Sequence, residues 1–294
     1  MTAQSGRSQI TYTDGTGLGG TEREIVSPER ALFTDLLAAE WLKLWTVRSI
    51  RWFVVGAALL VIGINLNGTR SDLSHWNGMN AHDRAYFARI SAPLSAFDRG
   101  AASWLMLALG ALGAVVVLNE ITTGMFQLEF TAVPARREVM AAKTLTVCGV
   151  AAAFGAFVAG VSFWGTQAML GAERGGISIT APGALRRLAV TILLAPIMAV
   201  VGMGLGVLLR HAVAAMVTLF TLVFVIPVFV RDNQYVPALI NHSLVFAAWD
   251  RLNQIGSIVG EPYSWGRAGA WTVYGVWSAV AIGLTVFLVD RRDQ

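Results

Sequence analysis

The residues whose side chains could do chemistry are few in this chain and widely spaced. The four histidines are His75, His82, His211 and His242. His75 and His82 could hold a metal together with the nearby Asp72 and Asp83, but their spacing matches no usual ligand pattern, and the metalloprotease motif His-Glu-x-x-His is missing. Asp250 and Glu261 would act as a catalytic carboxylate pair only if folding brought them together. We therefore predict no catalytic residue, no metal site and no enzymatic activity of the chain itself.

A phosphate-binding lysine is also missing. A nucleotide-binding P-loop needs Gly-x-x-x-x-Gly-Lys-Ser/Thr, whereas Lys43 follows Leu42 and Lys143 follows Ala142. These are the only two lysines, which we interpret as the codon bias of a GC-rich bacterium and not as chemistry. The single cysteine, Cys148, excludes an intrachain disulfide. If the protein uses ATP, the ATPase must be another chain.

The composition is that of a membrane protein. Only 14% of the residues are charged, against roughly 25% in soluble domains, and the mean hydropathy is +0.59. A membrane-spanning helix needs about 20 apolar residues. Six charge-free runs of suitable length are 52–69, 100–119, 144–172, 188–209, 211–230 and 268–289. We predict an all-α polytopic membrane protein, with a polar tail over 1–27 and a single transmembrane domain over 28–294.

The spans contain packing signals but no ionisable side chains. Pro196 should kink its helix and Pro227 should bend the next one. The segment 202–206, Gly-Met-Gly-Leu-Gly, and the series Ala151, Gly155 and Ala159 should let neighbouring backbones approach closely. An ion-coupled carrier usually keeps a charged residue near the membrane midplane. Its absence from the predicted spans disfavours that class.

Residues 28–51 have the pattern of a helix that lies on the membrane surface. Its apolar stripe consists of Phe33, Leu37, Trp41 and Leu44, and aromatic residues favour the membrane interface. Glu40 interrupts this stripe. We expect its carboxylate to reach water or to pair with a basic group of a partner.

Residues 119–143 form a polar island between two apolar runs. Apolar side chains recur at helical spacing within it, at Met125, Phe126, Leu128, Phe130 and Val133. This spacing predicts a short amphipathic helix, capped by Thr122 or Thr123, with Pro134 at the first position of the next helix. The alternative is an ordinary loop lying on the lipid headgroups.

The two longest segments between spans, 70–99 and 231–267, are rich in aromatic residues. We expect surface or half-inserted helices there. Basic clusters at 43–51, 136–143 and 291–292 favour cytoplasmic termini.

Four stretches remain to be considered together: Ala39–Leu44 with Arg48-Ser49; Glu120–Met125 continuing to Val133–Arg137 and Ala142-Lys143; Gly206–His211; and Asp290–Asp293. In this order, and with six predicted spans, they resemble the permease subunits of ABC-2 type ABC exporters. The resemblance implies two permease chains, expected to be identical, and two cytoplasmic ATPase subunits that bind ATP and Mg²⁺. Such an exporter would move a hydrophobic or amphiphilic drug, lipid or peptide out through a bacterial cytoplasmic membrane. An ion-coupled carrier or channel and a scaffold without transport activity are the alternatives.

The resemblance also implies roles for particular residues. A connecting helix over 28–51 would use Glu40, Trp41, Lys43 and Arg48. A coupling helix over 121–133 would contact the ATPase, with Glu120, Thr123, Gly124, Met125, Phe126, Gln127, Leu128, Glu129, Phe130, Arg136 and Arg137 at this contact. The second and fifth spans would line the cargo path with Trp104, Met106, Met216, Phe220 and Phe224.

Overall fold

The computed structural model describes residues 32–88, 92–95, 97–124, 136–230, 232, 234–254, 263 and 265–291. The chain divides into two units, Met1–Arg30 and Ala31–Gln294, and all described residues lie in the second. Their regular structure is entirely helical. The helices are α1 (Phe33–Thr46), α2 (Arg48–His75), η1 (Trp76–Gly78), α3 (Ala81–Tyr86), α4 (Ala92–Leu94), α5 (Arg99–Thr123), α7 (Arg136–Leu170), η3 (Ala172–Arg174), α8 (Ala184–Leu209), α9 (Ala212–Phe220), η4 (Thr221–Val225), α10 (Ile226–Phe229), α11 (Tyr235–Ser243), α12 (Val245–Asn253) and α13 (Arg267–Arg291).

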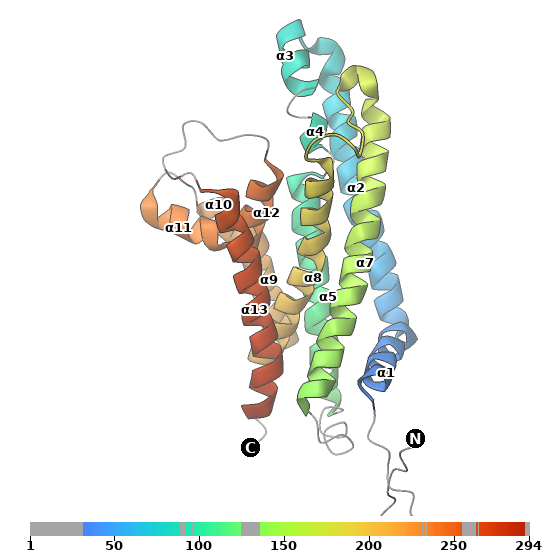
Figure 1. The fold of residues 1–294 in the computed structure, drawn as a ribbon, viewed down its shortest axis with the longest axis vertical. Coiled ribbons are helices and arrows are strands. Elements are labelled where there is room, and N and C mark those ends of the chain that lie inside the picture. Colours follow the sequence, from blue (N-terminus) through green and yellow to red (C-terminus); the bar gives the residue numbers. More distant parts are fainter. Residues whose placement is uncertain are drawn as a thin grey trace, which may run out of the picture. The chain divides into compact units, whose positions relative to one another are not determined.

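Six helical segments of this fold are long and apolar enough to cross a membrane, which confirms the predicted number of spans. They are α2 with η1, α5, α7, α8, the continuous α9–η4–α10 segment, and α13. Consecutive spans run in alternating directions, so α1 and the last turns of α13 lie at the same end of the bundle (Figure 1). The fold is that of a multi-pass membrane protein.

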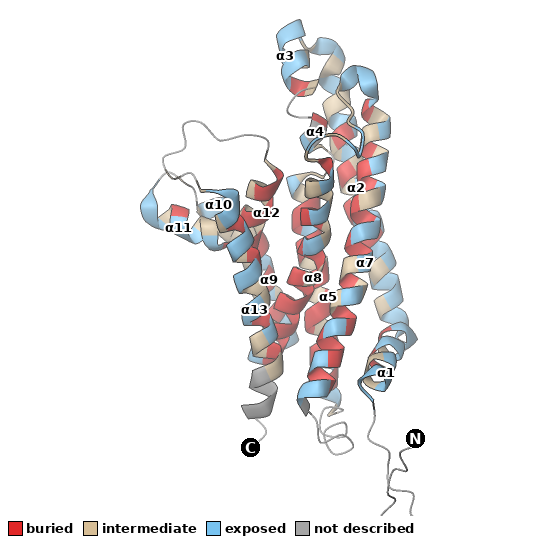
Figure 2. Ribbon diagram, in the orientation of Figure 1, coloured by how far each residue is buried: buried red, intermediate tan, exposed pale blue. Residues whose placement is uncertain are grey.

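Two helices form the centre of the bundle. In the most apolar stretch of α5, 72% of the residues are buried inside the bundle, and in that of α8 the share is 67% (Figure 2). In α2, the α9–α10 segment and α13 the corresponding shares are only 17–28%. Glycines let α5 and α8 pack backbone to backbone. A β-carbon built on Gly202 would lie 1.8 Å from the carbonyl oxygen of Gly110, and one built on Gly113 would lie 1.9 Å from that of Ala199. The close approach predicted for the glycine segment is therefore confirmed.

The small residues of α7 serve the same purpose. Ala151 and Ala159 are buried, and a β-carbon on Gly155 would lie 2.8 Å from the Cβ atom of Ala195 in α8. Since small side chains shorten the distance between helix axes, α7 packs along α8 on the face that its sequence predicts.

The two prolines have different local surroundings. Helix α8 continues through Pro196 over its full length. The fifth span instead contains the π-helical turn η4 directly before Pro227. A proline has no N–H to donate to the carbonyl one turn earlier, and a π-helical turn is one way in which a helix accommodates that lost bond.

The long connections contain short helices, as predicted. Helices α11 and α12 fold back between α10 and α13. Trp249 of α12 is almost completely buried, and its indole Nε1–H donates to Thr191 Oγ1 of α8 over 3.1 Å. Its ring also packs edge to face on Phe97, with 6.2 Å between ring centres. This hydrogen bond and ring contact hold α12 inside the bundle.

Several predicted boundaries were wrong. Helix α1 ends at Thr46, Val47 is extended, and α2 begins at Arg48, so residues 48–51 belong to α2, the first of the six long apolar helices, and not to the helix predicted over 28–51. Residues 121–123 continue α5, which ends at Gly124 with a left-handed φ of 69°. Thr122 and Thr123 lie in the last turn of α5, and their hydroxyls donate to carbonyls one turn earlier, of Leu118 and Asn119. The helix predicted to follow them lies outside the described residues.

Candidate functional site, a buried ion cluster

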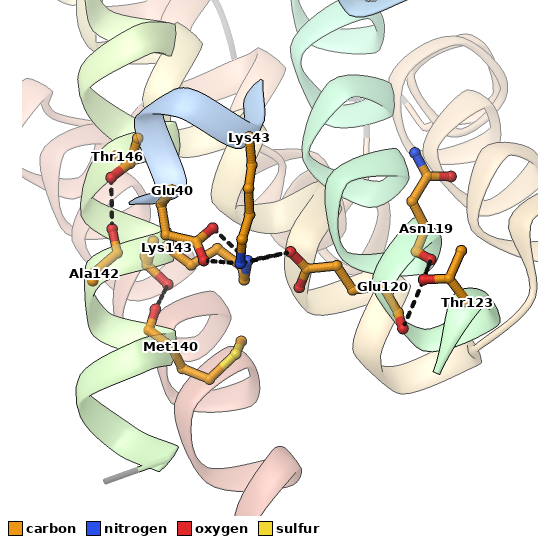
Figure 3. A network of polar contacts seen from close by, with 10 residues as sticks. Glu40, Lys43, Asn119, Glu120, Thr123, Met140, Ala142, Lys143 and Thr146 are labelled. Carbon is orange, nitrogen blue, oxygen red and sulfur yellow. Dashed lines mark hydrogen bonds and ion pairs between the residues drawn. The ribbon is translucent and has the colours of Figure 1, made fainter. Parts of the chain in front are cut away.

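Four charged side chains meet at the end of the bundle where α1 lies (Figure 3). Lys143 of α7 is completely buried and donates through Nζ to Glu40 Oε2 of α1 and to Glu120 Oε1 of α5, both over 2.5 Å. Lys43, one turn after Glu40, donates to Glu40 Oε1 over 2.7 Å and lies 3.9 Å from Glu120 Oε1. Three helices are thus joined by one network, which we call the ion cluster.

The local sequence explains why α1 turns Glu40 towards the bundle. Helix α1 starts at Phe33, where the Asp35 carboxylate accepts the N–H of Leu32 over 3.0 Å, which is one half of a capping box. Glu40 and Leu44 are four residues apart, so they lie on the same side of α1, and both are buried against the bundle. Trp41 and Trp45 are exposed. The side of α1 that carries Glu40 is therefore its packed side.

Among the described residues, the ion cluster places two carboxylates against two ammonium groups. Opposite charges that pair in this way reduce the cost of removing each of them from water. The burial is uneven, because the Lys143 side chain is inaccessible to solvent while that of Lys43 is 34% exposed. Lys143 is consequently the central cation, and Lys43 closes the network on the solvent side.

Both expectations for Glu40 were wrong. Its carboxylate neither reaches water nor needs a partner chain, since it pairs with two lysines of its own chain. The two lysines, to which sequence analysis gave no chemical role, both lie in the ion cluster. Glu120 and Lys143 also fall within the spanning helices, so these helices are longer than the predicted charge-free runs.

Two members of the ion cluster, Glu120 and Lys143, lie at the two ends of the polar island 119–143 that sequence analysis singled out. Glu120 precedes Gly124 by one turn, and Lys143 follows Arg136 by two turns, which at 1.5 Å per residue is about 6 Å and about 10 Å along the helices. The predicted contact residues Met125–Phe130 lie outside the described part of the chain. Arg136 begins α7 and Arg137 is exposed.

The structure brings together most of the residues predicted for a cargo path. Trp104 of α5 with Met216 and Phe220 of α9 line an apolar groove that is bounded on its other side by α2. The groove holds about 950 Å³ of empty space, its open side included. Phe224 packs on Trp104 and Phe220, with ring centres 5.4 and 5.2 Å apart.

Met106 does not join this groove. It lies on the opposite face of α5, is almost completely buried, and contributes to a smaller cavity with Met198, Val223 and Trp277. Since α5 is packed on most of its surface, residues two positions apart, such as Trp104 and Met106, point to different neighbours.

The other candidates for chemistry that the structure describes have separate contacts. Within the described ranges, no group of three or more His, Cys, Asp or Glu side chains could hold a metal ion. His75 contacts the backbone carbonyl of Ser71 in its own helix. Asp250 is held by Arg99 through two bonds of 2.8 and 2.6 Å, and its proposed companion Glu261 is not among the described residues.

Sequence reasoning did not include Lys143 among the site residues. The signal available in the sequence was that Glu120 and Lys143 each border a predicted apolar run, at the two ends of the polar island 119–143. No protein-family model and no curated protein sequence matches this chain.

Proposed function

We propose that this chain is the membrane-spanning permease subunit of an ATP-driven exporter of the ABC-2 type. In this proposal two identical chains would pair in a bacterial cytoplasmic membrane with their termini in the cytoplasm. Two ATPase subunits would bind to the segment between α5 and α7. The cargo would be hydrophobic or amphiphilic.

The observation that carries the proposal is the ion cluster. A permease without its own ATP site must convert a movement of the ATPase subunits, bound at its cytoplasmic surface, into a movement of its spans. The ion cluster joins the surface helix α1 to α5 and α7, the two spans that flank residues 125–135. A force on that segment would therefore move three helices together, because separating them would leave charges buried without partners.

The apolar groove supports the predicted cargo class. Its walls come from α2, α5 and α9, and apart from backbone groups they carry only apolar and aromatic side chains: Phe53, Gly56, Ala57, Leu60, Trp104, Leu107, Ala108, Ala111, Met216 and Phe220. A wall of this kind favours an apolar ligand, because it offers no hydrogen bonds to replace those a polar cargo makes with water. In a paired assembly, the groove would lie where a second chain and the cargo both have access.

The first test is purification of the tagged protein from its native membrane, with mass spectrometry and an ATPase assay on what copurifies. We expect an ATP-binding subunit and ATP hydrolysis. A preparation that contains this chain alone and has no ATPase activity would refute the proposal.

A second test addresses the coupling segment. Replacing Phe126, Leu128 and Phe130 by alanine should uncouple ATP hydrolysis from efflux of a fluorescent lipophilic dye. The matched control replaces Val236, Leu239 and Ile240 of α11, which are also large, apolar and exposed, and should leave coupling unchanged. Wild-type efflux by the first variant would show that this segment does not transmit the movement.

A further inference from the structure

The apolar groove occupies a short stretch of two antiparallel spans. Helices α2 and α5 run in opposite directions (Figure 1), and a β-carbon built on Gly100 of α5 would lie 3.8 Å from Ile64 of α2. Pairing the helices outward from this contact places residues 104–111 of α5 opposite residues 53–60 of α2. All groove-lining residues of these two helices fall within these ranges. At 1.5 Å per residue, the groove is about 10 Å long.

No charged side chain lines this groove. At one end, Arg99 precedes Trp104 by five positions, which is about 7.5 Å along α5. At the other end, Arg51 precedes Phe53 by two positions, and two residues turn a helix by a little more than half a revolution, so Arg51 lies on nearly the opposite side of α2. An ionic group inside the groove would therefore lose its water without gaining a counter-ion.

One residue of the groove wall has no side chain to fill the space before it. A β-carbon built on Gly56 of α2 would meet no neighbouring side chain and no other helix within 4 Å, although Gly56 lines the groove. By contrast, the same atom built on Gly202 would lie 1.8 Å from the Gly110 carbonyl oxygen. Gly56 therefore serves no contact between helices, and its missing side chain leaves room in the groove.

We propose that Gly56 determines the size of the cargo that the groove accepts, and that this cargo is an uncharged, largely hydrocarbon molecule taken from the membrane. This inference rests on the proposed function, in which the groove is the cargo path. The groove opens between side chains that are 42–48% exposed, those of Phe53, Leu60 and Phe220, and in a membrane such surfaces meet hydrocarbon. A larger residue at position 56 would project into the groove and exclude part of a large cargo.

The test labels the tagged protein in its native membrane with two uncharged photoreactive probes. Both carry a diazirine, one on an adamantane-sized and the other on a steroid-sized hydrocarbon, and mass spectrometry locates the labelled residues. We expect both probes to label the groove residues of α2, α5 and α9 in a saturable manner. Phe157 and Trp164 of α7, which are also apolar and exposed, provide the reference for probe that is merely dissolved in lipid. A carboxylated form of the smaller probe should not compete for the groove.

The variant Gly56→Leu should raise the half-saturating concentration of the steroid-sized probe about eightfold, because four side-chain carbons displace about four ligand atoms that each contribute a factor of about 1.7 in affinity. The adamantane-sized probe should label this variant nearly as well as the wild type, which also shows that the variant is folded. Gly56→Ala should give a smaller effect of the same kind. Gly63→Leu is the matched control and should change neither probe, since Gly63 lies on the same helix in equally open space but does not line the groove.

Labelling requires neither ATP nor an ATPase subunit, so this test can succeed or fail independently of the copurification experiment. Equal labelling of the groove and of the α7 reference residues would overturn the proposal, because the probes would then only dissolve in the membrane. It would also be overturned if Gly56→Leu affected both probes equally or neither of them. Competition by the carboxylated probe would refute the assignment to uncharged cargo. If Gly56→Leu abolished chemical crosslinking between two copies of the chain and left labelling intact, the groove would be a contact between copies instead.

Discussion

Replacing Lys143 by methionine tests whether the ion cluster holds three helices together. Methionine approximates the length and volume of the lysine stem, so the change removes the charge and leaves little empty space. The Lys143 ammonium is the group that contacts both Glu40 and Glu120 at 2.5 Å. Without it, Glu40 and Glu120 would lose the one ammonium group that contacts both of them, and the partly exposed Lys43 would stay near both.

The size of the effect follows from the burial of the charges. Removing one partner of a buried ion pair costs about 3–5 kcal/mol, because the remaining charge stays buried without compensation. At 1.4 kcal/mol per factor of ten, the equilibrium between folded and unfolded protein shifts roughly 100- to 4000-fold. Lys43→Met is the matched control. Its side chain is 34% exposed, and ion pairs open to solvent contribute about 1 kcal/mol or less.

The assay is reversible unfolding in mixed micelles, followed by circular dichroism, for Lys143→Met, Lys43→Met and Lys143→Met/Glu120→Gln. The double variant removes one negative charge together with the positive one, so we expect it to regain more than half of the lost stability, a coupling within the range known for neighbouring residues. The reasoning fails if Lys143→Met costs no more than Lys43→Met, or if the double variant is less stable than Lys143→Met.

Three further predictions concern packing and the groove. Gly202→Ala should cost about 1–3 kcal/mol of stability through overpacking, because its methyl group would meet the Gly110 carbonyl, whereas Gly63→Ala, with nothing within 4 Å, should be neutral or slightly stabilising; thermal unfolding in detergent distinguishes them. Trp249→Phe should cost about 1–3 kcal/mol, since it leaves a cavity and removes a buried hydrogen bond; equal protease resistance of α12 in variant and wild type would contradict this. Phe220→Ala should reduce dye efflux while the melting temperature stays within a few degrees, because this side chain is 48% exposed; unchanged efflux would count against the groove as a cargo path.

Much of the fold could be predicted from one-dimensional patterns. The six spans follow from the length of apolar runs, because an apolar bilayer core leaves a helix of about 20 residues as the simplest way to satisfy every backbone hydrogen bond. The close packing of α5, α7 and α8 follows from glycine and alanine at four-residue spacing. Both signals are local, since they depend on residues within one helix.

The ends of the helices could not be predicted as well. Charged residues at the ends of an apolar run look like loop residues, so Arg48, Glu120 and Lys143 were left outside the spans. In the structure they lie within α2, α5 and α7, because a helix continues for as long as its charged side chains find partners or water. That condition depends on neighbouring helices and is invisible in the run itself.

The sequence by itself determined that this chain is a six-span helical membrane protein with few side chains suited to chemistry. Only the tertiary structure decided what those few side chains do. Glu40 and Lys143 are 103 positions apart and have no shared periodicity, yet the packing of α1 on α7 brings their charges into contact. Burial then converts two isolated charges into an interaction strong enough to join helices, because removing either one would leave the other in an apolar interior.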